Sequence, residues 1–87
     1  SFPEMATRLT ARDRVSRRLL ERVVDIAAER GDVAVKVLAL QRIAAAAPDE
    51  AAVRLRLASA LRDAGRLDEA ERLFREELAR ATGEEER

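Results

Sequence analysis

Residues 51–82 read AAVRLRLASALRDAGRLDEAERLFREELARAT, and this stretch carries the strongest fold signal of the chain. Leucine, alanine, glutamate and arginine dominate it, a composition that favours α-helix. Gly65 divides it into two segments, each with apolar residues at intervals of three and four. This spacing places apolar side chains on one side of a helix. The stretch therefore predicts two helices joined by a tight turn.

The rest of the chain is also divided into segments by helix-breaking residues, which are Gly31, Pro48 and Gly83. Between these breaks no segment shows the alternation of apolar and polar residues that is typical of strands. The pattern therefore predicts an all-α protein with about four long helices and one short N-terminal helix. Their expected ranges are 3–9, 11–30, 33–46, 50–64 and 68–81.

Candidate helix caps mark several of these starts. Thr10 followed by Asp13 resembles a capping box, in which a threonine oxygen accepts a first-turn N–H. Asp32 is placed to cap the helix after Gly31, and Asp49 the helix after the break at Pro48.

The two glycines Gly31 and Gly65 are 34 residues apart, and each lies between two expected helices. Overlaying residues 17–48 on residues 51–82 pairs apolar positions with apolar positions, although few residues are identical. The paired positions include Leu19 with Val53, Val23 with Leu57, Ala27 with Leu61, Val33 with Leu67 and Leu40 with Phe74. A helix–turn–helix unit with this period is typical of the tetratricopeptide repeat.

The second unit resembles that family in its order of large, small and aromatic positions. Arg54 replaces the usual tryptophan, and Thr82 replaces the closing proline. The residues that carry the resemblance are Leu57-Ala58, Leu61, Gly65, Leu67, Asp68-Glu69-Ala70, Phe74 and Leu78.

The first unit is similar but degenerate. Lys36 stands where the second unit has Ala70, a small residue that lets the paired helices approach. We therefore expect Lys36 either to extend its charged end to solvent or to splay the two helices. The matching residues are Val23-Val24, Ala27, Gly31, Val33, Leu40 and Pro48.

The resemblance implies a right-handed α-solenoid with a simple division of the chain. Residues 1–16 form an N-terminal helical extension or cap, 17–48 a first repeat, 49–82 a second repeat and 83–87 a polar tail. The expected core of the second repeat consists of Leu57, Leu61, Leu67, Ala70 and Phe74. In the first helix of the first repeat the apolar residues recur every four positions on one stripe, with Leu20 and Val24 beside it. The members of the stripe are Val15, Leu19, Val23 and Ala27.

Composition excludes several classes of function. The chain has no cysteine and no histidine, so thiolate metal sites and the commonest general base are absent. Its glycines are isolated and form no phosphate-binding loop. Paired carboxylates such as Glu21 and Asp25 lie beside Arg18 and Arg22, as in an ion-paired helix surface. We therefore expect neither an enzyme nor a bound cofactor or metal.

Charge and hydropathy make nucleic acid and membrane less favoured as partners of this chain. The formal net charge is zero, and although residues 8–22 carry six arginines against two acids, aromatic residues for base stacking are missing. No apolar run approaches the roughly 20 residues of a membrane span, and no signal-peptide pattern is present. We expect a cytoplasmic protein that binds protein or peptide rather than nucleic acid or membrane. The excess of arginine over lysine is typical of a GC-rich bacterial coding sequence.

The family resemblance implies a binding face built from the first helix of each repeat. Two readings stay open: arginines at equivalent places hold acidic groups of a partner, or Glu21 and Asp25 already neutralise them. Leu55 is either a partner contact or an ordinary exposed leucine. The expected partner-binding residues are Arg18, Arg22, Asp25, Leu55, Arg56, Ser59 and Arg62, with Glu21, Glu29 and Asp63 beside them.

The alternative is a structural oligomerisation segment excised from a larger protein. Two repeats leave apolar flanks uncovered, since about three are normally needed. Residues 1–31 and 32–66 each carry a net charge of +2, whereas residues 67–87 carry −4. We therefore expect head-to-tail self-association that weakens with salt and with removal of residues 84–87.

Overall fold

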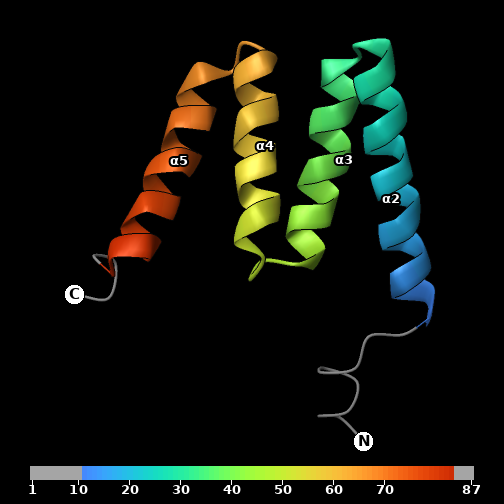
Figure 1. Cartoon of the computed structure of the whole chain (residues 1–87), viewed down its shortest axis with the longest axis horizontal. Coiled ribbons are helices and arrows are strands. Elements are labelled where there is room, and N and C mark those ends of the chain that lie inside the picture. The colour runs from blue at the N-terminus through green and yellow to red at the C-terminus, as the bar shows by residue number, and fades with distance from the viewer. Residues whose placement is uncertain (1–10, 84–87) are drawn as a thin grey trace, which may run out of the picture.

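The computed structural model describes residues 11–83, with side chains from residue 16 onward. This part of the chain forms four α-helices and no strand, so the all-α prediction is confirmed (Figure 1). Each predicted end of these four lies within one residue of the observed end. The expected helix 3–9, the capping box at Thr10 and the polar tail after Gly83 lie outside the described residues. The helices are α2 (Ala11–Arg30), α3 (Val33–Ala46), α4 (Ala51–Asp63) and α5 (Leu67–Thr82).

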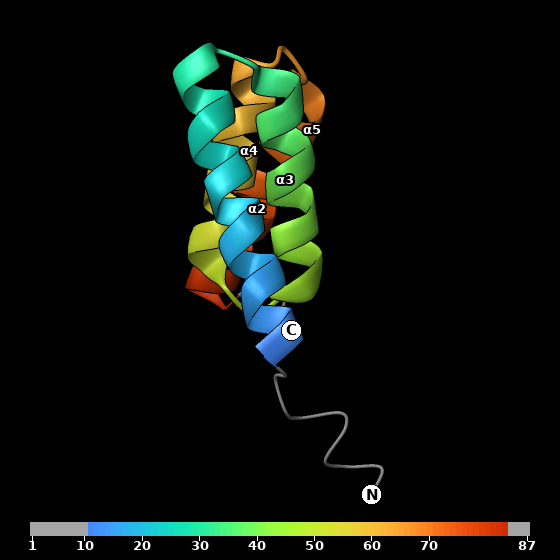
Figure 2. The ribbon, with the colours of Figure 1, turned by 90° about the vertical axis from the view of Figure 1, so that its right-hand side faces the viewer.

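The helices form two antiparallel hairpins, α2–α3 and α4–α5, which stand side by side (Figure 1). Seen from the side, α2 and α4 lie in one layer and α3 and α5 in the other (Figure 2). The backbones approach closely within each hairpin and between α3 and α4. Among the described residues, no Cα of α2 lies within 8 Å of a Cα of α4. The two hairpins are therefore joined mainly through α3 and α4.

The turns inside the two hairpins repeat the same backbone hydrogen bonds. In the first turn the N–H of Asp32 donates to the carbonyl of Ala27, at 2.8 Å. In the second turn the N–H of Arg66 donates to the carbonyl of Leu61, at 2.9 Å. Both are the long bond of a Schellman motif, which satisfies a free carbonyl at a helix end. The 34-residue period is thus present in the turn geometry as well as in the sequence.

Each of these turns contains a glycine with positive φ, 70° at Gly31 and 82° at Gly65. A Cβ built on Gly65 meets no atom within 4 Å, so its substitution strains only the backbone. We predict that Gly65→Ala lowers the free energy of unfolding by about 1–2 kcal/mol, and Gly65→Asn by less, because asparagine adopts this conformation more readily. Urea unfolding followed by circular dichroism measures both. An alanine variant as stable as the wild type would contradict the assigned turn.

The predicted caps are half correct. The side chain of Asp32 accepts a hydrogen bond from the backbone N–H of Val35 at 3.2 Å, as expected. The prediction for Asp49 is wrong, because the N-cap of α4 is Glu50, whose side chain makes no capping bond. The Glu50 carboxylate instead binds Arg17 of α2.

The core lies in the seam between α3 and α4. Its largest fully buried side chains are Val37, Leu40 and Ile43 of α3 and Val53 of α4. Further buried side chains come from each of the other helices, so the seam continues into both hairpins. These are Val24 of α2 and Ala70 of α5, and Leu20 of α2 and Leu73 of α5 pack against the same cluster.

The predicted core of the second hairpin is correct for three residues and wrong for two. Leu57, Leu61 and Ala70 are buried. Leu67 is 60% exposed and Phe74 37% exposed. Among the described helices α5 packs closely only against α4, so the side of α5 that carries these two residues has no covering helix.

The predicted stripe of α2 is also partly wrong. Of the expected stripe Ala27 is buried, as predicted, but Leu19 and Val23 are exposed, and the side chain of Val15 lies outside those described. Val24, expected beside the stripe, is buried, and Leu20 packs against the core. The helix turns its Leu20–Val24–Ala27 side toward α3. Leu19 and Val23 remain uncovered because, among the described helices, α2 packs closely only against α3.

Lys36 does not splay the first hairpin. Its side chain is only half-buried, whereas Ala70 at the equivalent place is buried. The two hairpins nevertheless pack equally closely. The lysine is therefore accommodated at the edge of the hairpin, with part of its side chain in solvent.

Two leucines on α3 test the position of the core. Leu40 is fully buried and Leu38 is 58% exposed. We predict that Leu40→Ala lowers the free energy of unfolding by about 2–5 kcal/mol, because it removes buried contacts and leaves a cavity. The matched control Leu38→Ala should change it by no more than about 0.5 kcal/mol. Similar losses in the two variants, measured by urea unfolding, would contradict the assigned seam.

Candidate protein-binding surface

A chain of ion pairs spans the face formed by α2 and α4. Arg17 of α2 donates from both terminal nitrogens to Glu50, with Nη1–Oε2 and Nη2–Oε1 distances of 2.9 and 3.0 Å. Arg56 of α4 donates in the same way to Glu21 of α2, at 3.2 and 2.9 Å. Arg17 Nε also donates to Glu21 Oε2 at 3.2 Å, which closes the chain. We call these four residues the bridging network.

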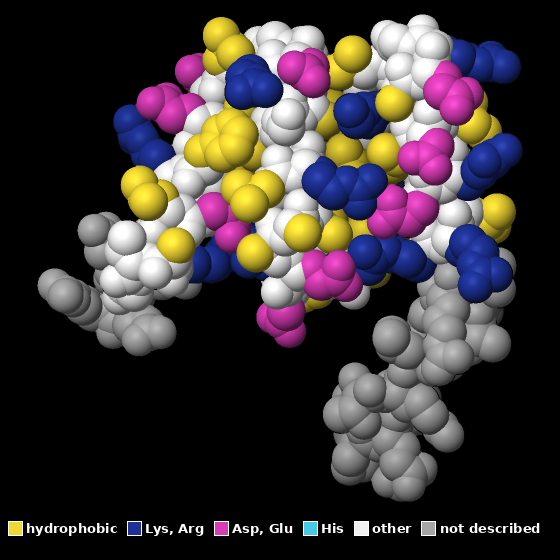
Figure 3. Space-filling view, in the orientation of Figure 1, with side chains coloured by type: hydrophobic (Ala, Val, Ile, Leu, Met, Phe, Trp, Pro, Cys, Tyr) yellow, Lys and Arg dark blue, Asp and Glu magenta, His cyan; other side chains and the backbone are white. Residues whose placement is uncertain are grey.

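The bridging network connects two helices whose backbones do not touch. Long arginine and glutamate side chains cross the gap, and both interhelical pairs are two-pronged, the geometry in which guanidinium and carboxylate bind best. In the space-filling view basic and acidic groups alternate across this face, with hydrophobic side chains visible between the helices (Figure 3). The network therefore links α2 to α4 through side chains alone.

The network also shifts the ionisation of its carboxylates. The hydrogen bond from Arg56 is the main cause that lowers the pKa of Glu21, and that from Arg17 lowers the pKa of Glu50. Conversely, the bond to Glu50 raises the pKa of Arg17. Folding thus favours the ionised form of all three groups.

A lowered carboxylate pKa stabilises the fold above the unfolded value of 4.5, and this stabilisation is lost as pH falls through the folded value. We predict that the free energy of unfolding decreases between neutral pH and about pH 3. The Glu21→Gln variant should lose measurably less stability over this range, by up to about 1 kcal/mol, because it has no Glu21 carboxylate to protonate. Urea titrations at the two pH values measure this.

The matched control is Glu29→Gln, which removes an exposed carboxylate from the same helix. Glu29 forms no ion pair with any residue whose side chain the structure describes. This variant should keep the pH dependence of the wild type. A Glu21→Gln variant with unchanged pH dependence would contradict the role of the network.

On α2, three predicted partner-binding residues share one exposed stripe. Arg18, Arg22 and Asp25 lie three and four residues apart and are all exposed. None of them forms an ion pair with another described side chain. Of the two arginines at equivalent places, Arg56 is neutralised by Glu21, as one of the two readings expected, whereas Glu21 does not pair with Arg22.

The predicted residues of α4 are divided between two places. Arg56 is engaged by Glu21 in the bridging network. Leu55 and Arg62 are exposed, Ser59 is half-buried, and Arg62 borders a groove shared with α5. The structure thus does not bring the predicted residues into one cluster.

A second group of ion pairs ties α4 to α5. Arg54 donates through Nε and Nη2 to Glu77 and through Nη1 to the Pro48 carbonyl. Glu77 also accepts from Arg80. The Arg54 and Glu77 side chains are only 14% and 10% exposed. A largely covered ion pair therefore joins α4 to α5.

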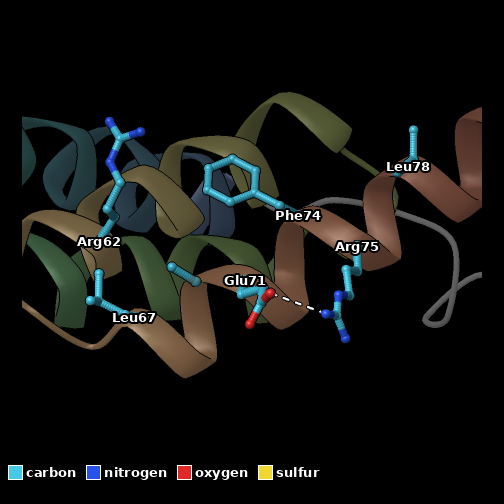
Figure 4. Close-up of a pocket in the computed structure, with 7 residues that line it drawn as sticks. Arg62, Leu67, Glu71, Phe74, Arg75 and Leu78 are labelled. Atoms are coloured by element: carbon cyan, nitrogen blue, oxygen red, sulfur yellow. Dashed lines mark hydrogen bonds and ion pairs between the residues drawn. The ribbon is translucent and has the colours of Figure 1, made fainter.

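A shallow groove of about 460 Å³ runs along α5 at its border with α4 (Figure 4). Phe74, Leu78 and Arg62 project to one side of it, while Glu71 pairs with Arg75 at the other side, at 3.1 Å. Leu67 and Ala70 complete its apolar lining.

Arg17 and Glu50 were not among the predicted site residues. Arg17 lies 33 residues from Glu50, and Glu21 lies 35 residues from Arg56. No local spacing rule identifies such pairs. The overlay of the two repeats brings the helices into register, but it does not say which exposed charges meet.

The described side chains contain no group of three or more acidic residues placed to hold a metal ion. Within the same part of the chain, no helix combines the length and the apolar character needed to cross a bilayer. Comparisons with protein-family models, with curated proteins and with solved structures find no match to this chain.

Proposed function

We propose that the chain is a protein-interaction module of the tetratricopeptide type, which binds a peptide or partner helix on the face of α2 and α4. Two observations support the repeat assignment. The 34-residue period holds in the apolar pattern, and the same hydrogen bonds recur in the two hairpin turns. The first helices of the two hairpins share one layer, as expected for a solenoid binding face (Figure 2).

The observation that carries the binding proposal is that, among the described side chains of this face, some arginines are ion-paired and others are not. In the bridging network Glu50 and Glu21 already engage Arg17 and Arg56 within the chain. Arg18 and Arg22, which follow Arg17 and Glu21 in sequence, are exposed and form no ion pair with another described side chain. Exposed arginines on a helix can form two-pronged bonds to the carboxylates of a partner.

The partner is therefore an acidic segment that lies along α2. Asp25 determines the register of the partner segment on α2, because it repels a carboxylate of the partner and attracts a basic group of the partner one helical turn beyond the arginines. On α4, Ser59 offers a hydroxyl and Leu55 an apolar contact. Arg56 is a positioning residue, because a partner carboxylate would have to displace Glu21 to reach it.

Selection from a random-peptide display library tests this proposal without a known partner. We predict that immobilised protein enriches peptides with two or more acidic residues. The double variant Arg18→Ala/Arg22→Ala should weaken their binding at least tenfold, since each charge-assisted bond contributes about 1.5–3 kcal/mol. Fluorescence anisotropy of a selected peptide measures the dissociation constant.

The matched control removes two exposed arginines from the other layer, in the variant Arg42→Ala/Arg72→Ala. It has the same net charge as the test variant and should bind as the wild type does. Equal weakening in the two variants would show non-specific charge attraction and overturn the proposal. Enrichment of peptides without acidic residues would overturn it as well.

A further inference from the structure

One side of α5 carries a row of uncovered apolar side chains. Leu67, Phe74 and Leu78 are exposed, with Leu67 and Leu78 60% and 65% accessible. Their spacing of seven and four residues places them on the same face of the helix. They line the groove between α4 and α5, in which Phe74 and Leu78 project to the same side (Figure 4). We call these three residues the α5 face.

The opposite edge of the molecule carries a second apolar row, on α2. Leu19, Val23 and Ile26 are exposed, with Leu19 62% accessible. They lie four and three residues apart and share one helix face. We call them the α2 face. The two edges are separated by the two-hairpin stack, so they cannot cover each other within one molecule (Figure 1).

The seam between the hairpins shows what these two faces fit. The residues 34 positions before the α5 face are Val33, Leu40 and Ala44, which belong to or pack against the core cluster. Leu40 is fully buried there, whereas its equivalent Phe74 is exposed. The α5 face therefore repeats, on the outer edge, the α3 surface that receives α4.

The α2 face has the complementary relation to α4. The residues 34 positions after Leu19, Val23 and Ile26 are Val53, Leu57 and Ala60, all of which are buried in the seam. The α2 face thus repeats the α4 surface that α3 receives. The α5 face thus corresponds to the α3 side of the seam, and the α2 face corresponds to the α4 side.

Charge favours the same pairing of edges. Helix α2 contains six arginines and four acidic residues, and α5 contains three arginines and five acidic residues. The two helices carry net charges of +2 and −2. Contact between two α5 faces would bring like charges together, whereas contact between an α5 face and an α2 face brings opposite charges together.

We propose that the α5 face docks on the α2 face of a second copy of this chain, in a contact that repeats the internal seam between hairpins. Such a contact is heterologous, so it joins chains head to tail and leaves one free face of each kind at the ends of the assembly. It uses edges other than the face proposed for peptide binding.

Two variants that each destroy one face test this proposal. Leu19→Glu/Ile26→Glu places charges on the α2 face, and Leu67→Glu/Leu78→Glu places charges on the α5 face. Light scattering coupled to size exclusion should show a wild-type mass above 9.7 kDa that rises with concentration, and each variant alone as a monomer. An equimolar mixture of the variants should form a dimer of about twice the monomer mass, because each supplies the face that the other lacks.

The complementation separates this contact from every other one. If the chains associate through a two-fold contact, at least one variant still associates when alone. If there is no specific contact, the mixture or the wild type stays monomeric. Either result overturns the proposal. Formation of the mixed dimer also shows that both variants are folded. If circular dichroism shows that a double variant has lost helicity, the single variants Leu19→Glu and Leu78→Glu are mixed instead. Leu38→Glu, on an exposed leucine of α3, is the control that should associate as the wild type does.

Discussion

The packing of α3 against α4 is the interaction on which the rest of the structure depends. The largest fully buried side chains lie in this seam, and three of the four come from α3. Without it the hairpins would have little to hold them together, because α2 and α4 meet only through side chains. In a chain of 87 residues with two aromatic residues, one well-packed seam supplies much of the apolar burial that offsets chain entropy.

The seam also determines which surfaces remain for binding. By placing α2 and α4 in one layer, it brings Arg17 within reach of Glu50 and Arg56 within reach of Glu21. These pairs use the charges nearest the gap and leave Arg18 and Arg22 in solvent. The same packing covers only one side of each outer helix among the described residues, which leaves the α2 face and the α5 face exposed.

Much of the fold could be predicted from the sequence because glycine and proline residues clearly mark the helix ends. Gly31, Pro48 and Gly65 fix the helix ends, and the 34-residue period pairs the hairpins. The same period misplaced Leu67 and Phe74 in the core, because it identifies equivalent positions without saying which of them have a neighbour. The bridging network was missed for a different reason: its partners are far apart in sequence and are brought together only by the seam.

Native-state hydrogen exchange measured residue by residue by NMR tests the role of the seam most directly. If the two hairpins depend on one seam, the most protected amides belong to α3 and α4 around Leu40, Ile43 and Leu57, and they exchange together with the free energy of global unfolding. The outer helices α2 and α5 should open at lower free energy. Slowest exchange in α5, or separate unfolding of the α2–α3 and α4–α5 hairpins, would contradict this account.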